Sequence, residues 1–187
     1  GVNVDIIDER ADFSGYRIVC APALYVVAPE TVQRLYAFAE RGGTVILTAR
    51  SGVKDAHNNC IAAPLPTVYR ELTGCHAAEY DPIGWGTNNI KFADDSRFTC
   101  KQWCDILESD SAEILAQYDS DFYAGSAAVT VNRFANGTAY YIGTVGERKL
   151  YEHIARMTLE AQHLPYYADL PDNVEVTTRT GDGISVQ

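Results

Sequence analysis

Acidic side chains are the most numerous groups in this chain that could do chemistry, with 25 Asp and Glu against 15 Lys and Arg and a formal net charge of −10. Hydrolysis of a glycosidic bond would need two carboxylates held about 5 to 10 Å apart across a cleft. The sequence instead groups its carboxylates within single turns, namely Asp5, Asp8, Glu9 and Asp12, then Asp94 and Asp95, then Asp119 and Asp121. Because no pair is marked as coming from separate strands, we interpret them as solvated turn residues.

Two residues are candidate nucleophiles, and neither has the surrounding sequence that catalysis requires. Ser51 follows a predicted buried strand, but the G-x-S-x-G nucleophile elbow needs two glycines, and Ala49 and Val53 stand in their place. Cys20 falls inside a predicted strand, where a thiol is usually inert. The histidines show no ligand spacing; they are His57, His76, His153 and His163. We therefore predict that the chain has no catalytic residue.

The sequence shows no pattern for a metal or a cofactor either. Its five cysteines are Cys20, Cys60, Cys75, Cys100 and Cys104. Cys100 and Cys104 form a C-x3-C pair without a companion pair or nearby histidine to complete a zinc site. We expect reduced thiols in a cytoplasmic protein. Gly42 and Gly43 precede a strand and not a helix, so they do not form a phosphate-binding loop. We predict no metal and no cofactor.

The net charge also bears on partners. A formal charge of −10 argues against binding to nucleic acid or to an anionic membrane surface, because both require basic patches. No stretch of the sequence approaches the roughly 20 apolar residues of a membrane-spanning helix. We therefore expect neither nucleic acid nor membrane as a partner.

One short segment carries both signs of charge at the carboxyl end of a predicted strand. It contains Arg50, Ser51, Lys54 and Asp55, with Gly52 between them. Open α/β sheets usually place their ligands at this end of a strand. Two interpretations stay open: a loop closed by its own salt bridges, or a loop that contacts another domain or subunit and could wall its pocket.

The elements that must position this segment begin with a helix and a buried strand. Pro29 to Arg41 has helical spacing, and Gly42 and Gly43 stand where that spacing stops. Thr44 to Ala49 is apolar without alternation, which indicates a strand covered on both faces. The following 51–65 region reads as a long polar loop. This helix–strand–loop unit is typical of an α/β sheet.

The remaining elements complete one domain of 187 residues. A second helix is predicted over 147–163, and one or two helical turns over 66–72. Further strands are predicted over 2–8, 16–22, 75–80, 112–118, 127–134, 138–143 and 174–178, with Asn136-Gly137 marking a hairpin. No element can be drawn through 81–101. The link between the first two strands is too short for a crossover helix, so we expect another strand, before Gly1, to separate them.

Four stretches, in order, resemble the middle domain of family 42 glycoside hydrolases, the bacterial β-galactosidases. They are Tyr16-Arg-Ile-Val-Cys-Ala-Pro-Ala-Leu-Tyr25, Gly42-Gly-Thr-Val-Ile-Leu-Thr-Ala-Arg-Ser-Gly-Val-Lys-Asp55, Asn132-Arg-Phe-Ala-Asn-Gly-Thr-Ala-Tyr-Tyr-Ile-Gly-Thr144 and Leu170-Pro-Asp-Asn-Val-Glu-Val176. The likeness spans nearly the whole chain. The segment around Cys100 and Cys104 departs from it.

This resemblance implies a three-layer α/β fold with a mostly parallel sheet, of the class I glutamine-amidotransferase-like (flavodoxin-like) type, here without the first strand and helix. It implies a non-catalytic trimerisation domain over residues 1–168, followed over 169–187 by a linker and the first strand of a C-terminal β domain. The partners would be two further copies of the chain and the (β/α)8 barrel of the parent enzyme, which hydrolyses terminal β-D-galactosides by a retaining mechanism. The alternatives are a stand-alone amidotransferase-like small-molecule enzyme or sensor, and a plain protein-binding module.

Overall fold

The computed structural model describes residues 2–167, 170, 171, 173, 174, 176, 179–181 and 184–186. Eight strands form the main sheet, in the order β1-β3-β9-β8-β7-β5-β6-β10. They are β1 (Ile18–Ala21), β3 (Thr44–Thr48), β5 (Cys75–Phe92), β6 (Arg97–Ser109), β7 (Glu113–Tyr118), β8 (Ala127–Phe134), β9 (Gly137–Ile142) and β10 (Thr144–Gly146). The helices are α1 (Pro29–Glu40), α2 (Arg70–Thr73) and α3 (Arg148–Ala161), with the 3-10 turn η1 (Thr67–Tyr69). Two short pairs lie outside this sheet: β2 (Val26–Val27) with β4 (Lys54–Asp55), and β11 (Arg179–Gly181) with β12 (Ile184–Val186).

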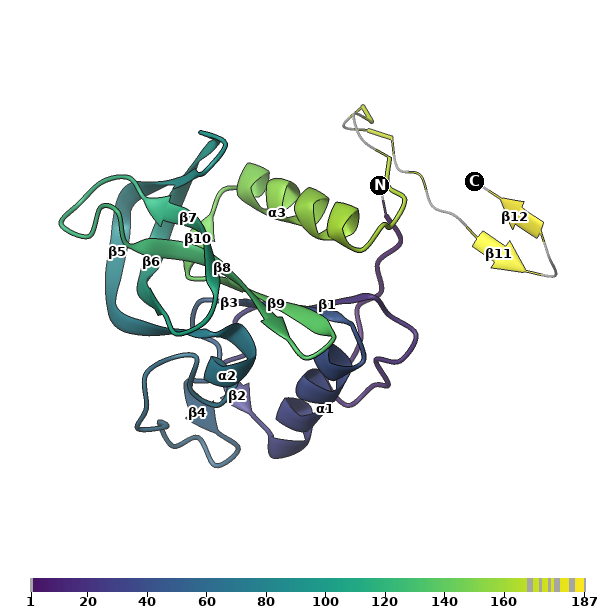
Figure 1. Cartoon of the computed structure of the whole chain (residues 1–187), viewed down its shortest axis with the longest axis horizontal. Coiled ribbons are helices and arrows are strands. Elements are labelled where there is room, and N and C mark those ends of the chain that lie inside the picture. The colour runs from purple at the N-terminus through teal and green to yellow at the C-terminus, as the bar shows by residue number, and fades with distance from the viewer. Residues whose placement is uncertain are drawn as a thin grey trace.

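The parallel part of the main sheet lies between helices. β3 pairs in parallel with β1 along one edge and with β9 along the other. Figure 1 shows α3 on one side of these strands and α1 and α2 on the opposite side. The first four residues of β3 are buried, as expected for an apolar strand whose two faces are both covered.

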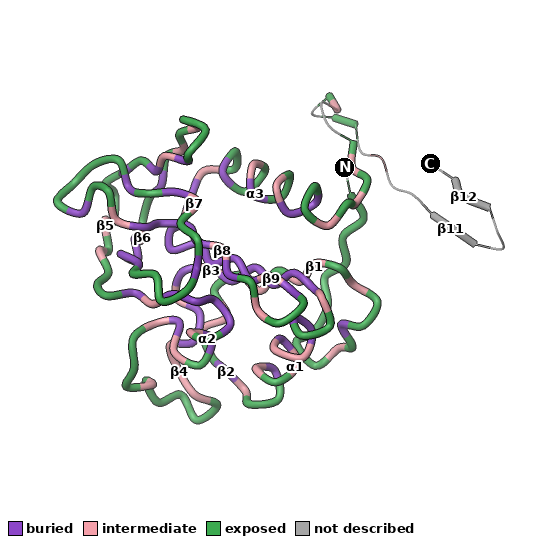
Figure 2. The backbone as a smooth tube through the Cα atoms, in the orientation of Figure 1, coloured by how far each residue is buried: buried purple, intermediate pink, exposed green. Residues whose placement is uncertain are grey.

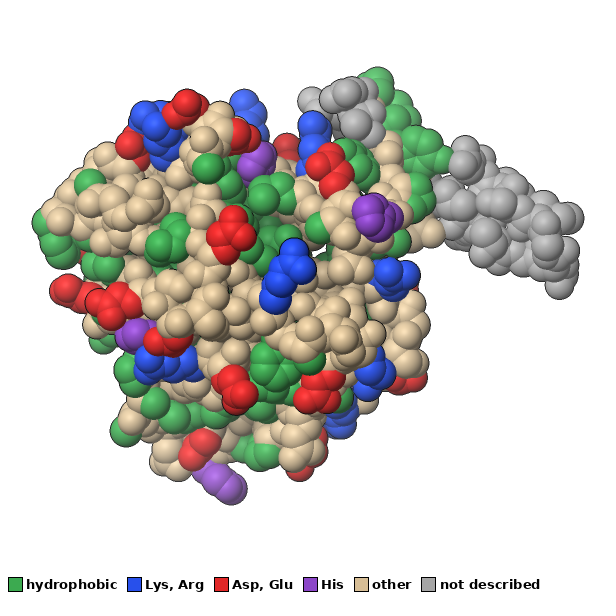
Figure 3. Space-filling view, in the orientation of Figure 1, with side chains coloured by type: hydrophobic (Ala, Val, Ile, Leu, Met, Phe, Trp, Pro, Cys, Tyr) green, Lys and Arg blue, Asp and Glu red, His purple; other side chains and the backbone are tan. Residues whose placement is uncertain are grey.

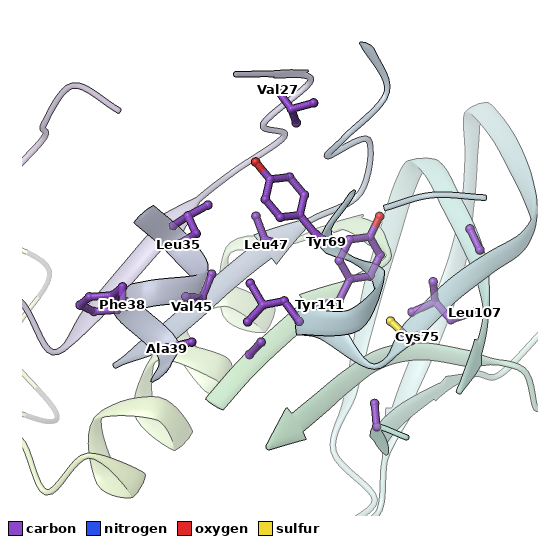
Figure 4. Close-up of a cluster of buried hydrophobic side chains, with 14 of the residues drawn as sticks. Val27, Leu35, Phe38, Ala39, Val45, Leu47, Tyr69, Cys75, Leu107 and Tyr141 are labelled. Carbon is purple, nitrogen blue, oxygen red and sulfur yellow. The ribbon is translucent and has the colours of Figure 1, made fainter. Parts of the chain in front are cut away.

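Successive side chains of β3 enter two hydrophobic clusters, one on each face of the sheet, and buried positions concentrate there in Figure 2. Val45 and Leu47 pack on the α1 side, where Figure 4 shows them beside Leu35 and Phe38. Ile46 packs on the other side, in the cluster that contains Leu150 and Ile154 of α3. Complete burial of such aliphatic side chains is worth roughly 1.5–3 kcal/mol each, so this sandwich holds the parallel strands in place.

The other part of the sheet is antiparallel and closes on itself. β8, β7, β5 and β6 pair in that order, and a contact between Leu107 of β6 and Ala127 of β8 completes the ring. The β5–β6 register shifts near Ala77, Asp81 and Gly84. Such bulges bend a strand and increase its twist, which lets the 18 residues of β5 curve around a closed barrel.

The predicted fold class is therefore wrong. The main sheet has two parallel pairings, β1–β3 and β3–β9, and its other pairings are antiparallel. The described residues contain three α-helices beside a closed antiparallel barrel. This is not a three-layer, mostly parallel α/β sheet of the glutamine-amidotransferase-like (flavodoxin-like) type. The alternative of a stand-alone amidotransferase-like enzyme or sensor loses its structural basis with it.

Several local predictions are confirmed, and others need correction. The helices predicted over 29–41 and 147–163, the buried strand after Gly43 and the hairpin between β8 and β9 are all present. The region 81–101, in which no element was predicted, contains most of β5 and the start of β6. The predicted strand over 2–8 has no ladder partner in the described chain, and its Val4 and Ile6 are 76% and 101% exposed.

The ends of the chain leave other predictions open. A strand before Gly1 was expected because it would separate strands at 2–8 and 16–22, and this argument does not hold, since residues 2–8 form no strand. β1 lies at an edge of the sheet with β3 as its one partner among described strands, and the presence of an earlier strand stays a prediction. Residues 175, 177 and 178 of the strand predicted over 174–178 lie outside the described residues. None of the described helices is long and apolar enough to cross a membrane. On the face seen in Figure 3, acidic and basic side chains are interspersed and form no single patch.

Candidate functional site around Arg50 and Trp103

Arg50 lies in the turn that follows β3 and has a left-handed backbone, with φ at 69°. A non-glycine residue pays about 1–2 kcal/mol for this conformation, and such residues concentrate at functional sites. Both neighbours of Arg50 are held by hydrogen bonds. The Ala49 N–H donates to the Ile142 carbonyl at 2.7 Å, and the Ser51 N–H donates to the Thr48 carbonyl at 3.2 Å. The ends of β3 and β9 thus set the conformation of this turn.

Ser51 ties the turn to the neighbouring 23–25 segment. It is fully buried. Its hydroxyl donates to the Thr48 carbonyl at 2.7 Å and accepts the Leu24 N–H at 3.2 Å. These two hydrogen bonds give Ser51 a structural role, because they connect the turn after β3 to the 23–25 segment.

The Arg50 side chain lies between two aromatic rings that come from different parts of the chain. Its guanidinium carbon is 4.2 Å from the centre of the Trp103 ring and 5.2 Å from the centre of the Tyr25 ring. Its Nη2 also donates to the Tyr25 hydroxyl at 3.1 Å. Trp103 in turn stacks on Tyr80, with ring centroids 5.0 Å apart and planes inclined by 19°. The four side chains form one continuous stack, which we call the Arg50–Trp103 stack.

The buried carboxylate of Asp105 fixes one member of this stack, Trp103, by a hydrogen bond. Asp105 is fully buried and accepts two hydrogen bonds, from the Trp103 indole Nε1 at 2.7 Å and from the Tyr141 hydroxyl at 2.8 Å. Burial raises the pKa of Asp105, while these two donors and the nearby Arg50 oppose the rise. Burial also raises the pKa of Tyr141 well above its usual value, so this hydroxyl stays a donor at neutral pH. Asp105 therefore fixes the orientation of the Trp103 ring.

Lys54 and Asp55 do not join the stack. Both lie in β4, where Lys54 Nζ donates to Asn58 Oδ1 at 2.9 Å. The Asp55 carboxylate accepts the backbone N–H groups of His57 and Asn59, at 2.9 and 2.8 Å. The bond from Asn59 lowers the pKa of Asp55 most. Among the described residues no ion pair joins Arg50, Lys54 and Asp55, so the salt-bridged loop considered from the sequence is not what the structure contains.

The stack is suited to contact with another surface. Tyr25, Arg50 and Trp103 are each partly exposed, and arginine and aromatic side chains are enriched in protein interfaces. Tyr80 is 55% exposed, and Trp85, which follows the Gly84 that pairs with Gln102, is fully exposed at 105%. Across the part of the chain that is described, no group of three or more His, Cys, Asp and Glu side chains could hold a metal ion.

Sequence reasoning identified Arg50 but missed its partners. Trp103 and Asp105 lie in β6, beyond the region where no element was predicted, and Tyr25 and Tyr80 lie in segments with no functional motif. One available signal was the alternation Trp103-Cys104-Asp105, which places the tryptophan and the aspartate on one side of a strand. It becomes informative only once β6 is recognised as a strand.

A family model described as the β-galactosidase trimerisation domain matches residues 1–165. The β-galactosidase BgaA of Clostridium cellulovorans is 42% identical over 177 residues, which is 95% of this chain and 27% of that protein. The β-galactosidase BglY of Alicyclobacillus acidocaldarius is 34% identical over 98% of this chain and 28% of its own length. The crystal structure of the β-galactosidase from Bacillus circulans sp. alkalophilus superposes with a TM-score of 0.91 at 30% identity, covering 97% of this chain and 28% of that one. The chain thus spans little more than a quarter of the length of these relatives.

Proposed function

The chain belongs to the family of β-galactosidase trimerisation domains, and on that premise we propose that it assembles a glycoside hydrolase family 42 enzyme into a trimer. The observation that carries this proposal is the family match over residues 1–165. In this role the chain contributes surface and not reactive groups. The fully buried, doubly hydrogen-bonded Ser51 is in keeping with that role.

We propose further that the whole protein hydrolyses terminal β-D-galactosides with retention of configuration. The relatives named above are β-galactosidases, which supports the substrate class. A retaining mechanism uses two carboxyl groups about 5–5.5 Å apart, one as nucleophile and one as acid and base. We assign both to a (β/α)8 barrel domain of the same polypeptide, which would be the second partner of this chain.

We place the trimerisation domain at residues 1–168 and a linker with the start of a C-terminal β domain at 169–187. The family model ends at residue 165, close to this boundary. We also propose a cytoplasmic location. All five cysteines are free thiols, which is the usual state in a reducing compartment.

Within the trimer, we propose that the turn from Arg50 to Asp55 and the Arg50–Trp103 stack contact a neighbouring subunit and help wall its galactoside pocket. Two features support this. A strained turn is held in place at the carboxyl ends of β3 and β9. Exposed aromatic side chains, Tyr80 and Trp85, lie on the strand that pairs with the Trp103 segment. Aromatic and arginine side chains dominate binding energy where they become buried between subunits.

The test uses the full-length enzyme and two readouts. Trp103→Ala and Arg50→Ala should weaken assembly, measured as molar mass by light scattering over a dilution series, and raise KM for a nitrophenyl β-galactoside. Loss of an interface anchor typically costs about 2 kcal/mol or more, which is roughly a 30-fold change in a dissociation constant. Lys54→Ala should have the smaller effect, because Lys54 is bound to Asn58.

Arg148→Ala is the matched control, since it removes an arginine whose side chain is 85% exposed on α3. It should change neither readout. If Arg50→Ala and Trp103→Ala also leave both the trimer mass and KM unchanged, the stack is not an interface. A full-length protein that is monomeric before any substitution would overturn the assembly role itself.

A further inference from the structure

Cys100 and Cys104 face each other in the interior of the barrel. Their Sγ atoms are 4.0 Å apart, and both residues are fully buried. They belong to the same strand, β6, at positions four residues apart. In a regular strand such residues lie about 13 Å apart, so their proximity needs a structural cause.

The cause is a bulge in β6 between the two cysteines. Opposite them in β10, Thr144 pairs with Cys104 and Gly146 pairs with Cys100, so residues four apart in β6 oppose residues two apart in β10. Gln102, inside the bulge, has a left-handed backbone with φ at 68°. Residues four apart in a strand already lie on the same face, and the bulge shortens the distance between these two, so that their side chains meet.

The surroundings make the two thiols unequal. The contact between the two sulfurs lowers the pKa of Cys104 to about 6, against burial, which raises it. The hydrogen bond to Cys104 also raises the pKa of Cys100. Two thiols this close favour a state in which one is a thiolate and the other donates to it, and the shifts favour Cys104 as the thiolate.

The pair is connected to the Arg50–Trp103 stack. The Thr144 hydroxyl lies 3.7 Å from Cys104 Sγ and donates to the Trp103 carbonyl at 2.7 Å. Trp103 is itself a residue of the bulge, between Cys100 and Cys104. A covalent link between the two sulfurs would close the base of the loop that presents Trp103.

We propose that Cys100 and Cys104 are an oxidisable dithiol, a modification site at which a peroxide converts two buried thiols into an intramolecular disulfide. The sulfurs must approach each other by about 2 Å, to the S–S bond length of about 2.05 Å, and side-chain rotation can supply this movement. Both sulfurs are fully buried, so the proposal requires a local opening that admits a small oxidant. We assign this opening to the turn between β7 and β8, where the 74% exposed Phe122 packs on the buried Tyr123.

The reaction balances with one peroxide. The Cys104 thiolate attacks a peroxide oxygen, the O–O bond breaks, and the departing hydroxide takes up the proton that Cys104 lost, which leaves a sulfenic acid and one water. The Cys100 sulfur then attacks the sulfenic sulfur, the S–O bond breaks, and the leaving hydroxyl takes the Cys100 proton as a second water. Two electrons pass from the sulfurs to the peroxide oxygens.

The sequence between the cysteines gives a direct assay. Trypsin cleaves after Arg97, Lys101 and Arg133, so each cysteine falls on its own peptide, 98–101 or 102–133. The folded full-length protein is treated with hydrogen peroxide, unfolded in iodoacetamide and digested without reductant. We expect the two peptides to appear as one linked species, lighter than their sum by two hydrogen atoms and separated by dithiothreitol. Cys75 is equally buried, and its sulfur accepts from the Thr130 hydroxyl and contacts no other sulfur in the described chain, so it should remain fully alkylated.

Variants define the outcomes further. Cys100→Ser should abolish the linked species and leave a sulfenic acid on Cys104 that dimedone traps, whereas Cys104→Ser should abolish both products. The proposal is overturned if both peptides remain alkylated while the exposed Cys20 and Cys60 are oxidised. It is equally overturned if the link forms only after unfolding in urea, or if Cys104 proceeds to a sulfinic acid without linking. None of these results depends on the assembly role.

Discussion

The guanidinium carbon of Arg50 lies 4.2 Å from the centre of the Trp103 indole ring. Arg50 follows a parallel strand of the sheet, whereas Trp103 projects from a bulge in the antiparallel barrel. Asp105 completes the connection, because it accepts the indole N–H of Trp103 and the hydroxyl of Tyr141 from β9. This contact therefore joins the two halves of the domain at the surface that we assign to assembly.

Two substitutions at Arg50 distinguish the contribution of its side chain to stability from the cost of its left-handed backbone. Arg50→Ala and Arg50→Gly both lose the cation–π contacts, worth about 0.5–2 kcal/mol. Glycine alone relieves the left-handed strain at φ 69°, and after allowance for its greater freedom in the unfolded chain we expect Arg50→Gly to be the more stable by roughly 0.5–1 kcal/mol. Urea unfolding measures the difference. Equal stabilities, or a more stable alanine variant, would show that the turn does not hold this conformation.

Two fully buried tyrosines, both visible in Figure 4, should respond oppositely to loss of the hydroxyl. Tyr141→Phe removes a donor to the buried Asp105 carboxylate and should cost about 1–3 kcal/mol. The Tyr69 hydroxyl is the one buried side-chain N or O atom without a hydrogen-bond partner in the described part of the chain. Tyr69→Phe should therefore be neutral or stabilising. Thermal unfolding of both variants checks the contrast, and a loss at Tyr69 equal to that at Tyr141 would contradict it.

The buried carboxyl of Asp105 should leave a signature in the pH dependence of stability. Burial raises its pKa in the folded state above the value of about 3.9 for an unfolded chain. Between these two pKa values the folded state holds the proton more often, so Asp105 contributes a stability that is lost as pH rises through the folded pKa. The slope of this contribution is at most about 1.4 kcal/mol per pH unit.

Asp105→Asn isolates the contribution, since carboxylates such as Asp55 and Asp110, whose pKa values are lowered, titrate alike in both proteins. The free energy of unfolding of the wild type minus that of Asp105→Asn should decrease with pH in this window. A difference that is flat or that increases with pH would mean that hydrogen bonds from Trp103 and Tyr141, and not burial, govern Asp105. Urea titrations at pH steps between 4 and the neutral range provide the measurement.

Local sequence patterns were sufficient for the elements around β3. Apolar residues at helical spacing predicted α1 and α3, an apolar run predicted β3, and Asn136-Gly137 predicted the β8–β9 hairpin. Each of these patterns arises from interactions between residues a few positions apart, or from the burial of all side chains in one short segment. Both can be read from the local sequence. Arg50 could be singled out for the same reason, because it immediately follows β3.

The direction of strand pairing could not be obtained in this way, and the fold class was wrong as a result. A parallel and an antiparallel buried strand have similar composition, and β5 is interrupted by Pro82, Gly84 and Gly86, which resemble turn residues. The bulges of β5 can be recognised only from its pairing with β6, because each bulge is a shift in the register between these two strands. The same is true of residues 81–101, whose strands exist because they pair with each other.

The residue types of this chain were enough to indicate its helices, its buried central strand and its membership of a family of β-galactosidase trimerisation domains. They also singled out Arg50 as a candidate, because it directly follows that strand. Only the tertiary structure showed three other features. They are the closed barrel, the positions of Trp103 and Asp105 close to Arg50, and the short distance between the thiols of Cys100 and Cys104. Each of these depends on a strand register or a bulge, and a shift of one residue would turn the side chains to the opposite face of the sheet.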